Sequence, residues 1–81
     1  MAHGQRESFV IISTDREDGS ISRRYASLAD VMQHAHEQWP AAMRDYVQTY
    51  FIHKLRSMDV GDTFDGPNAL RFSDRIVMVG P

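Results

Sequence analysis

The chain has 81 residues, with 42% hydrophobic residues, 25% charged residues and a formal net charge of −2. This composition is typical of one folded domain and excludes a disordered chain or a strongly basic nucleic-acid binder. The absence of cysteine excludes disulfides and thiolate metal sites, and the apolar runs are too short for a membrane span or signal peptide. We expect one cytoplasmic domain over residues 8–81, after a flexible polar tail over residues 1–7.

The beginning of the domain predicts a β-hairpin. Residues 8–14 are β-branched and apolar on both faces, which is typical of a central strand covered on both sides, or of one covered on a single side within a dimer. Asp18 and Gly19 then form the dipeptide that most strongly favours a two-residue type I′ turn. Residues 20–26 would form the second strand of the hairpin.

This turn fixes a register for the hairpin. Ile12 would lie opposite Tyr25, and Ser13 would lie opposite Arg24. The alternation in the second strand favours Ile21 and Tyr25 as its core-facing residues. Arg23 would share this inner face, so either its aliphatic stem carries the charge out to solvent or the register differs by one residue.

Two helices are predicted to follow. Ser27 is a suitable N-cap for the first, with Asp30 placed to complete a capping box. Pro40 ends that helix and begins the second, over residues 40–58. The apolar residues of the second helix cover about half of its circumference, a wider arc than a surface helix usually shows. Ile52 falls outside this arc.

The remainder of the chain returns to a β pattern, with strands near residues 63–64, 69–72 and 76–79 and a turn over residues 65–68. Residues 73–74 are either a second turn or a bend. The order of elements predicts an α+β domain, in which a hairpin, two helices and two or three antiparallel strands place the helices on one face of the sheet.

The residues point away from catalysis and metal binding. His34 and His36 lie two positions apart on a predicted helix, whereas two ligands of one ion need a spacing of three or four. No serine stands in a nucleophile motif, and the glycines form no phosphate-binding loop. We therefore expect a protein that is not an enzyme and that has no catalytic residues, no cofactor and no metal.

The wide apolar arc suggests a binding surface on the second helix. The arc either lies wholly in the core or leaves part of itself for a partner. Asp59, Asp62, Asp65 and Asp74 could add an acidic cluster at one end of the sheet. The predicted function is a non-catalytic protein–protein interaction domain that forms a homodimer or binds a host protein. Its partner-binding residues would be Trp39, Tyr46, Phe51, Ile52, Leu55, Asp59, Asp62 and Asp65.

Small phage or mobile-element inhibitors of host complexes, such as anti-CRISPR proteins, share this small size and lack of motifs. That likeness is an analogy and not a sequence match.

The alternative function is nucleic-acid binding through the sheet. Arginines and aromatic residues alternate on the predicted strands, as in sheets that stack bases and contact phosphates. The residues that would make these contacts are Arg23, Arg24, Arg71 and Arg75, beside Tyr25 and Phe72.

Overall fold

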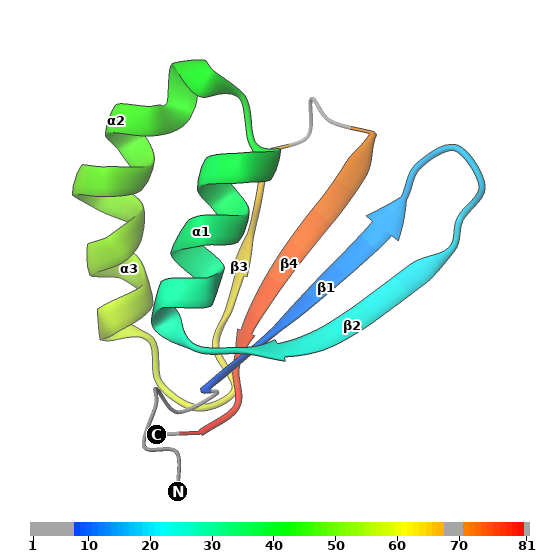
Figure 1. Ribbon diagram of the computed structural model, residues 1–81. Helices are drawn as coiled ribbons and strands as arrows, with labels where there is room; N and C mark the ends of the chain where they lie inside the picture. The colour runs from blue at the N-terminus through cyan, green and yellow to red at the C-terminus, as the bar shows by residue number, and fades with distance from the viewer. Residues whose placement is uncertain (1–7, 68–70, 81) are drawn as a thin grey trace, which may run out of the picture.

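The computed structural model describes residues 8–67 and 71–80. Four antiparallel strands form one sheet in the order β2-β1-β4-β3, and the helices all pack against one of its faces (Figure 1). The strands are β1 (Phe9–Asp15), β2 (Ile21–Ala26), β3 (Thr63–Asp65) and β4 (Phe72–Met78). The α+β class and the order of hairpin, helices and strands are confirmed.

The predicted hairpin register is wrong by two residues. Ile12 lies opposite Arg23, and Ser13 lies opposite Ser22. The connection is a four-residue loop over residues 16–19 in place of a two-residue turn, because Asp15 N–H donates to the Ser20 carbonyl at 2.7 Å.

The Asp15 side chain and backbone explain this longer loop. The carboxylate accepts the N–H of Glu17 at 2.8 Å, and the carbonyl accepts the N–H of Gly19 at 2.8 Å. Gly19 alone in the loop has a positive φ, of 77°, whereas a type I′ turn would require a positive φ at Asp18 as well. Local capping by Asp15 therefore decides the register.

The first helix, α1 (Leu28–Gln38), begins as predicted. Ser27 accepts the N–H of Asp30, and the Asp30 carboxylate accepts the N–H of Ser27, which completes a capping box. Trp39 is extended, with ψ of 158°, and ends the helix before Pro40.

The second helical segment runs through residues 41–57 as η1 (Ala41–Met43), α2 (Arg44–Tyr46), η2 (Val47–Phe51) and α3 (Ile52–Ser57). η2 is a π-turn, in which the N–H of Ile52 donates to the carbonyl of Val47. The extent of the predicted second helix is thus confirmed, with one extra residue in its middle turn.

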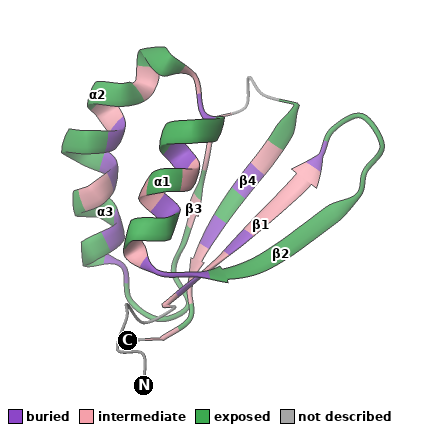
Figure 2. Cartoon of the chain, in the orientation of Figure 1, coloured by how far each residue is buried: buried purple, intermediate pink, exposed green. Residues whose placement is uncertain are grey.

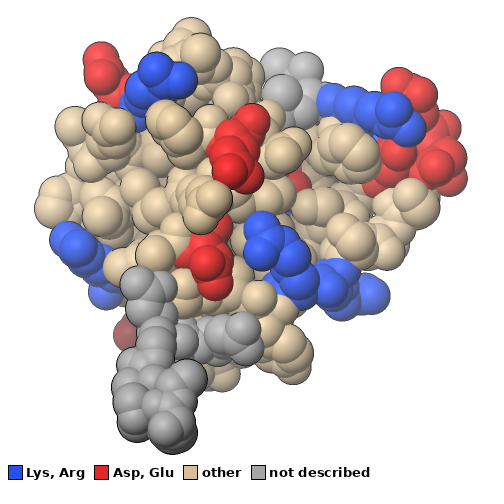
Figure 3. Space-filling model, in the orientation of Figure 1, with Lys and Arg blue, Asp and Glu red and all other residues tan. Residues whose placement is uncertain are grey.

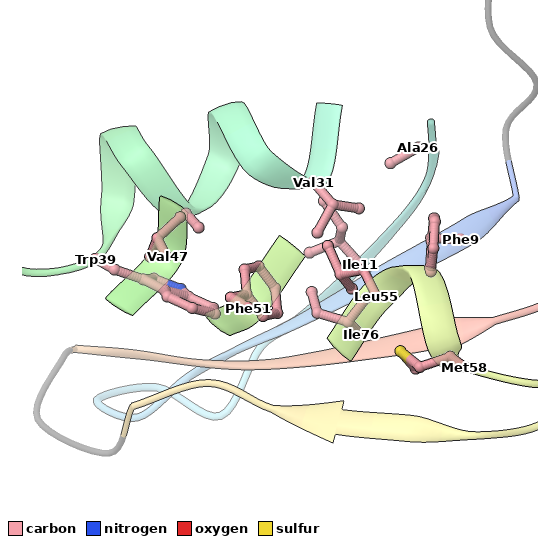
Figure 4. Packing of buried hydrophobic residues seen from close by; sticks show 11 residues of the cluster. Phe9, Ile11, Ala26, Val31, Trp39, Val47, Phe51, Leu55, Met58 and Ile76 are labelled. Atoms are coloured by element: carbon pink, nitrogen blue, oxygen red, sulfur yellow. The ribbon is translucent and has the colours of Figure 1, made fainter. Parts of the chain in front are cut away.

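The core lies between these helices and one face of the sheet (Figures 2 and 4). Phe9 and Ile11 of β1 define this core face, and Ile76 of β4 lies beside them. Their cross-strand partners on β2 are Ala26 and Arg24. Among the described residues, the buried apolar side chains are those of Phe9, Ile11, Ala26, Val31, Ala35, Trp39, Val47, Phe51, Leu55, Met58 and Ile76.

The prediction that Ile21 and Tyr25 face the core is therefore wrong. Both lie on the opposite face of the sheet, where they are 54% and 66% exposed. β2 has the predicted alternation, but its side with Ile21 and Tyr25 faces away from the helices.

β4 is continuous from Phe72 to Met78, so residues 73–74 form neither a turn nor a bend. Part of the predicted strand over residues 69–72, and the end of the predicted turn at Asn68, lie outside the described residues. None of the helices in residues 8–67 has the length and hydrophobicity that a membrane crossing requires.

Candidate functional site

The sheet face opposite the helices, which we call the open face, is the most extended candidate site. The strand registers arrange its side chains in three rows that cross the sheet. In strand order these rows are Tyr25, Val10, Val77 and Thr63; Arg23, Ile12, Arg75 and Asp65; and Ile21, Thr14 and Ser73.

The open face has an apolar centre and a polar rim. Val10, Ile12 and Val77 are half-buried on the two central strands, and none of the described helices lies over them. Tyr25 and Ile21 extend the apolar surface onto edge strand β2. Aliphatic and aromatic residues at the centre with arginine beside them are the composition that protein interfaces favour.

Two arginines and one aspartate carry the charge of this face. Arg75 Nε donates to Asp65 Oδ1 at 2.7 Å. This hydrogen bond lowers the pKa of Asp65 below its usual value and outweighs the opposite effect of burial. Arg23, across Ile12 from Arg75, has no hydrogen-bond or ion-pair partner among the described residues.

The other two candidate arginines point elsewhere. Arg24 shares the helix face and lies 3.4 Å from His34 Nδ1. Arg71 donates from Nη2 to Asp15 at 2.8 Å and stacks over Phe72 with 5.4 Å between the guanidinium carbon and the ring centroid. The four arginines therefore do not form one surface.

Most of the predicted partner surface on the second helical segment lies in the core. Trp39, Phe51 and Leu55 are at most 4% exposed, so they cannot contact a partner in this fold. Tyr46 and Ile52 are half-buried. The Phe51 ring packs against Trp39 and against Phe64 of β3, so the centre of the arc is covered within the fold.

The aspartates do not gather at one end of the sheet. Asp62 accepts the N–H of Asp59 in the turn before β3, and Asp65 belongs to the open face. Asp74 is 4% exposed on the helix face of β4. The predicted acidic cluster of these four residues is therefore not present, and that prediction is wrong.

Asp74 is instead the centre of a buried hydrogen-bond network. Its Oδ2 accepts from Trp39 Nε1 and His34 Nε2, both at 2.8 Å, and its Oδ1 accepts from the Ser13 hydroxyl at 2.6 Å. Burial alone would raise the pKa of Asp74, but these three hydrogen bonds outweigh it and the pKa lies below its usual value. The network joins β1, β4 and α1.

A cavity of about 390 Å³ opens beside this network, where the sheet extends past the end of α1. Ser13, Ser22, His34, Gln38 and Phe72 contribute to its walls, with Arg71 and Asp74. The Ser13 hydroxyl donates to Asp74 and not to a histidine, so it lacks the base that would activate it as a nucleophile. Within residues 8–67 and 71–80, no three His, Asp or Glu side chains converge as metal ligands.

Gly66 leaves room for this network. A Cβ at this position would lie 2.9 Å from a ring carbon of Trp39 and 3.3 Å from Cβ of Asp74. We expect Gly66→Ala to lower the free energy of unfolding by about 1–3 kcal/mol, because the buried indole has to move.

Urea denaturation measures this effect, with Gly80→Ala as control because its added Cβ meets nothing within 4 Å. Equal free energies of unfolding for the two variants would contradict the close contact.

Sequence reasoning missed Asp74 as a network centre and considered His34 only as a possible metal ligand. One signal was available, a tryptophan whose N–H needs an acceptor when buried, but this signal does not identify the acceptor. Comparison with protein-family models, with curated proteins and with solved structures finds no match to this chain.

Proposed function

We propose that this protein is a non-catalytic protein-interaction domain that binds a protein surface through the open face of its sheet. The observation that carries this function is that no helix within residues 8–67 and 71–80 covers Val10, Ile12 and Val77 on the two central strands. Antiparallel sheets often leave one face to solvent, but that face is then polar. Here it is apolar at its centre, as in an interface.

The open face thus replaces the second helical segment as the proposed contact surface. The partner is a second copy of the chain or a host protein, and the compartment is the cytoplasm, which suits a chain with no cysteine. A host protein complex as the partner would make the domain an inhibitor of the kind found in phages and mobile elements.

Nucleic-acid binding is the second candidate, because Arg23 and Tyr25 stand exposed on neighbouring rows of β2. Two features favour protein instead. Asp65 offsets the charge of Arg75, and Tyr25 is the only aromatic side chain in the three rows. The helix side of the molecule, which faces the viewer in Figure 3, carries interspersed acidic and basic side chains; the open face lies on the far side.

A matched pair of variants tests the location of the contact. Tyr25 on the open face and Tyr50 on the second helical segment are 66% and 55% exposed, so Tyr25→Asp and Tyr50→Asp make the same change at two exposed sites. We expect Tyr25→Asp to weaken partner binding at least tenfold, about 1.4 kcal/mol, and Tyr50→Asp to leave it unchanged.

The measurement is affinity capture of the tagged variants from host lysate after nuclease treatment, followed by titration of the captured protein. If Tyr50→Asp lost the partner and Tyr25→Asp kept it, the contact surface would be on the second helical segment and not on the open face. Capture that nuclease abolishes, with a steep salt dependence, would favour nucleic acid.

A further inference from the structure

We propose that the open face binds a second copy of this chain, in a twofold dimer whose sheets pack face to face and pair Arg23 with Asp65 of the partner subunit. This dimer presupposes the proposed function, because it uses the open face as its contact surface, and it names the partner.

The middle row of the open face carries the charges that choose this arrangement. In strand order it reads Arg23, Ile12, Arg75 and Asp65, so one end of the row is cationic and the other anionic. Arg23 is on β2 and Asp65 is on β3, at the two edges of the sheet. Neighbouring strands lie about 4.8 Å apart, so these edges are about 14 Å apart and the two side chains do not meet within one copy.

A twofold axis parallel to the strands brings the opposite edges together. This rotation exchanges the two edges and keeps the rows aligned, so β2 lies over β3 of the second copy. Arg23 then faces Asp65 of the partner subunit, and the symmetry repeats the contact at the other edge. This arrangement is compatible with aligned packing of two twisted sheets, whose strands lie about 30° apart.

A twofold axis across the strands gives the opposite result. It places each strand over its own copy, so Arg23 would face Arg23 of the partner subunit, and Arg75 and Asp65 would likewise meet their own kind. Like charges held together at an interface disfavour that arrangement. The charge order of the row therefore selects the axis parallel to the strands.

Arg23 and Asp65 can each make a further hydrogen bond across this contact. Arg23 has no partner among the described residues of its own chain. Arg75 makes its short bond to Asp65 Oδ1, whereas its contact with Oδ2 is 3.4 Å, so Oδ2 remains a good acceptor. In the neighbouring row, the same rotation places Val10 over Val77 of the partner subunit. In the middle row the same rotation places Ile12 over Arg75 of the partner subunit, so the apolar contact at the centre comes from the Val10 row and the charge pairs lie at both edges.

The size of the face sets the expected affinity. Strands of six or seven residues are about 20 Å long, four strands are about 15–20 Å wide and β3 has only three residues, so each copy offers a face of at most about 300–400 Å². This is smaller than the face of a stable interface and is typical of weak association. We expect a dissociation constant on the order of 10–100 µM at low salt.

Charge exchange and mixing test the pairing. Arg23→Asp alone places two aspartates at each edge contact, and Asp65→Arg alone places two arginines there, so each variant should self-associate at least tenfold more weakly than wild type. An equimolar mixture of the two variants restores opposite charges at both contacts. It should form a heterodimer with an affinity within about threefold of the wild-type dimer.

Sedimentation equilibrium gives the dissociation constants, and native mass spectrometry with one variant labelled with ¹⁵N identifies the heterodimer. Arg23 and Asp65 are exposed, so both variants should retain the wild-type circular dichroism spectrum. Arg56→Asp, on the exposed side of α3, is the matched control and should dimerise as wild type does. Arg23→Gln and Asp65→Asn provide neutral variants if a reversed charge disturbs the fold.

A wild-type chain that stays monomeric at 500 µM would overturn the dimer. So would a dimer that Arg23→Asp does not weaken, or a mixture that forms no heterodimer. A monomeric wild type whose host partner is still lost with Tyr25→Asp would remove only the dimer and leave the proposed function in place.

Discussion

Replacing Asp74 with alanine should lower the free energy of unfolding by about 3 kcal/mol, because the change orphans three hydrogen-bond donors at once. Trp39 Nε1 loses its acceptor in a site that is 4% exposed, and His34 Nε2 and the Ser13 hydroxyl lose theirs nearby. A small single domain has a total stability of roughly 5–10 kcal/mol, so this loss would be a large fraction of the whole.

The Asp74→Asn variant removes the negative charge and keeps nearly the same side-chain shape, so it measures the contribution of the charge. The amide oxygen can take the place of Oδ2 toward Trp39 and His34, while the NH₂ group donates to the Ser13 hydroxyl in place of Oδ1, so the hydrogen bonds are kept but the negative charge is lost. We expect Asp74→Asn to lose less stability than Asp74→Ala, because hydrogen bonds to a charged acceptor are stronger than those to a neutral one. Urea denaturation followed by circular dichroism measures each variant, with Asp45→Asn on the exposed side of α2 as control. A change no larger than the control's would show that the network contributes little.

The acid profile gives an independent measure of the same group. The pKa of Asp74 is lowered in the folded protein, so its contribution to stability is present above its unfolded pKa of about 3.9 and is lost as the pH falls through the folded value. Wild-type stability should therefore decline below about pH 4, and less steeply in Asp74→Asn. The remaining slope comes from Asp15 and Asp65, whose pKa values are lowered by Arg71 and Arg75. An unchanged slope in Asp74→Asn would contradict the ionised network.

The local features of this fold could be predicted from the sequence because local interactions specify them. The capping box of Ser27 and Asp30 uses residues three apart, and the corner at Trp39 follows from the geometry that Pro40 imposes. The alternation of strands and helices then limits the fold to an α+β sheet with helices on one face.

The Asp74 network could not be predicted, because its members are distant in sequence. Asp74 is 61 residues from Ser13, 40 from His34 and 35 from Trp39. An aspartate between a serine and an arginine indicates a turn when only neighbours are considered. Only the pairing of β1 with β4, and the packing of α1 over both, brings the donors to it.

The face of the sheet that the helices cover also could not be predicted from local sequence. Periodicity showed that Ile21 and Tyr25 share a side of β2, but the side that the helices cover is set by Phe9 and Ile11 on the neighbouring strand. The same limit applied to the second helical segment. The width of its apolar arc could be predicted from the sequence, whereas the elements that pack against this arc could not.

Phe51 tests whether the apolar arc of the second helical segment belongs to the core or to a partner surface. We expect Phe51→Ala to be the most destabilising apolar truncation on this segment. The side chain is 0% exposed, and its ring centroid lies 4.9 Å from that of Trp39 and 5.0 Å from that of Phe64. Truncation of a buried phenylalanine costs about 3–5 kcal/mol, from lost apolar burial and the cavity left behind. The ring joins α1, the second helical segment and β3, so its loss loosens all three contacts.

Tyr50→Ala is the matched control, because it truncates the neighbouring aromatic residue of η2 at a position that is 55% exposed. We expect it to change the free energy of unfolding by less than about 1 kcal/mol. Thermal and urea unfolding, with Trp39 fluorescence as the probe, compare the two variants. If the helix were a partner surface, Phe51→Ala would spare stability and reduce binding. A core role requires the reverse order, with Phe51→Ala largely unfolded at 37 °C and Tyr50→Ala folded and still bound to its partner.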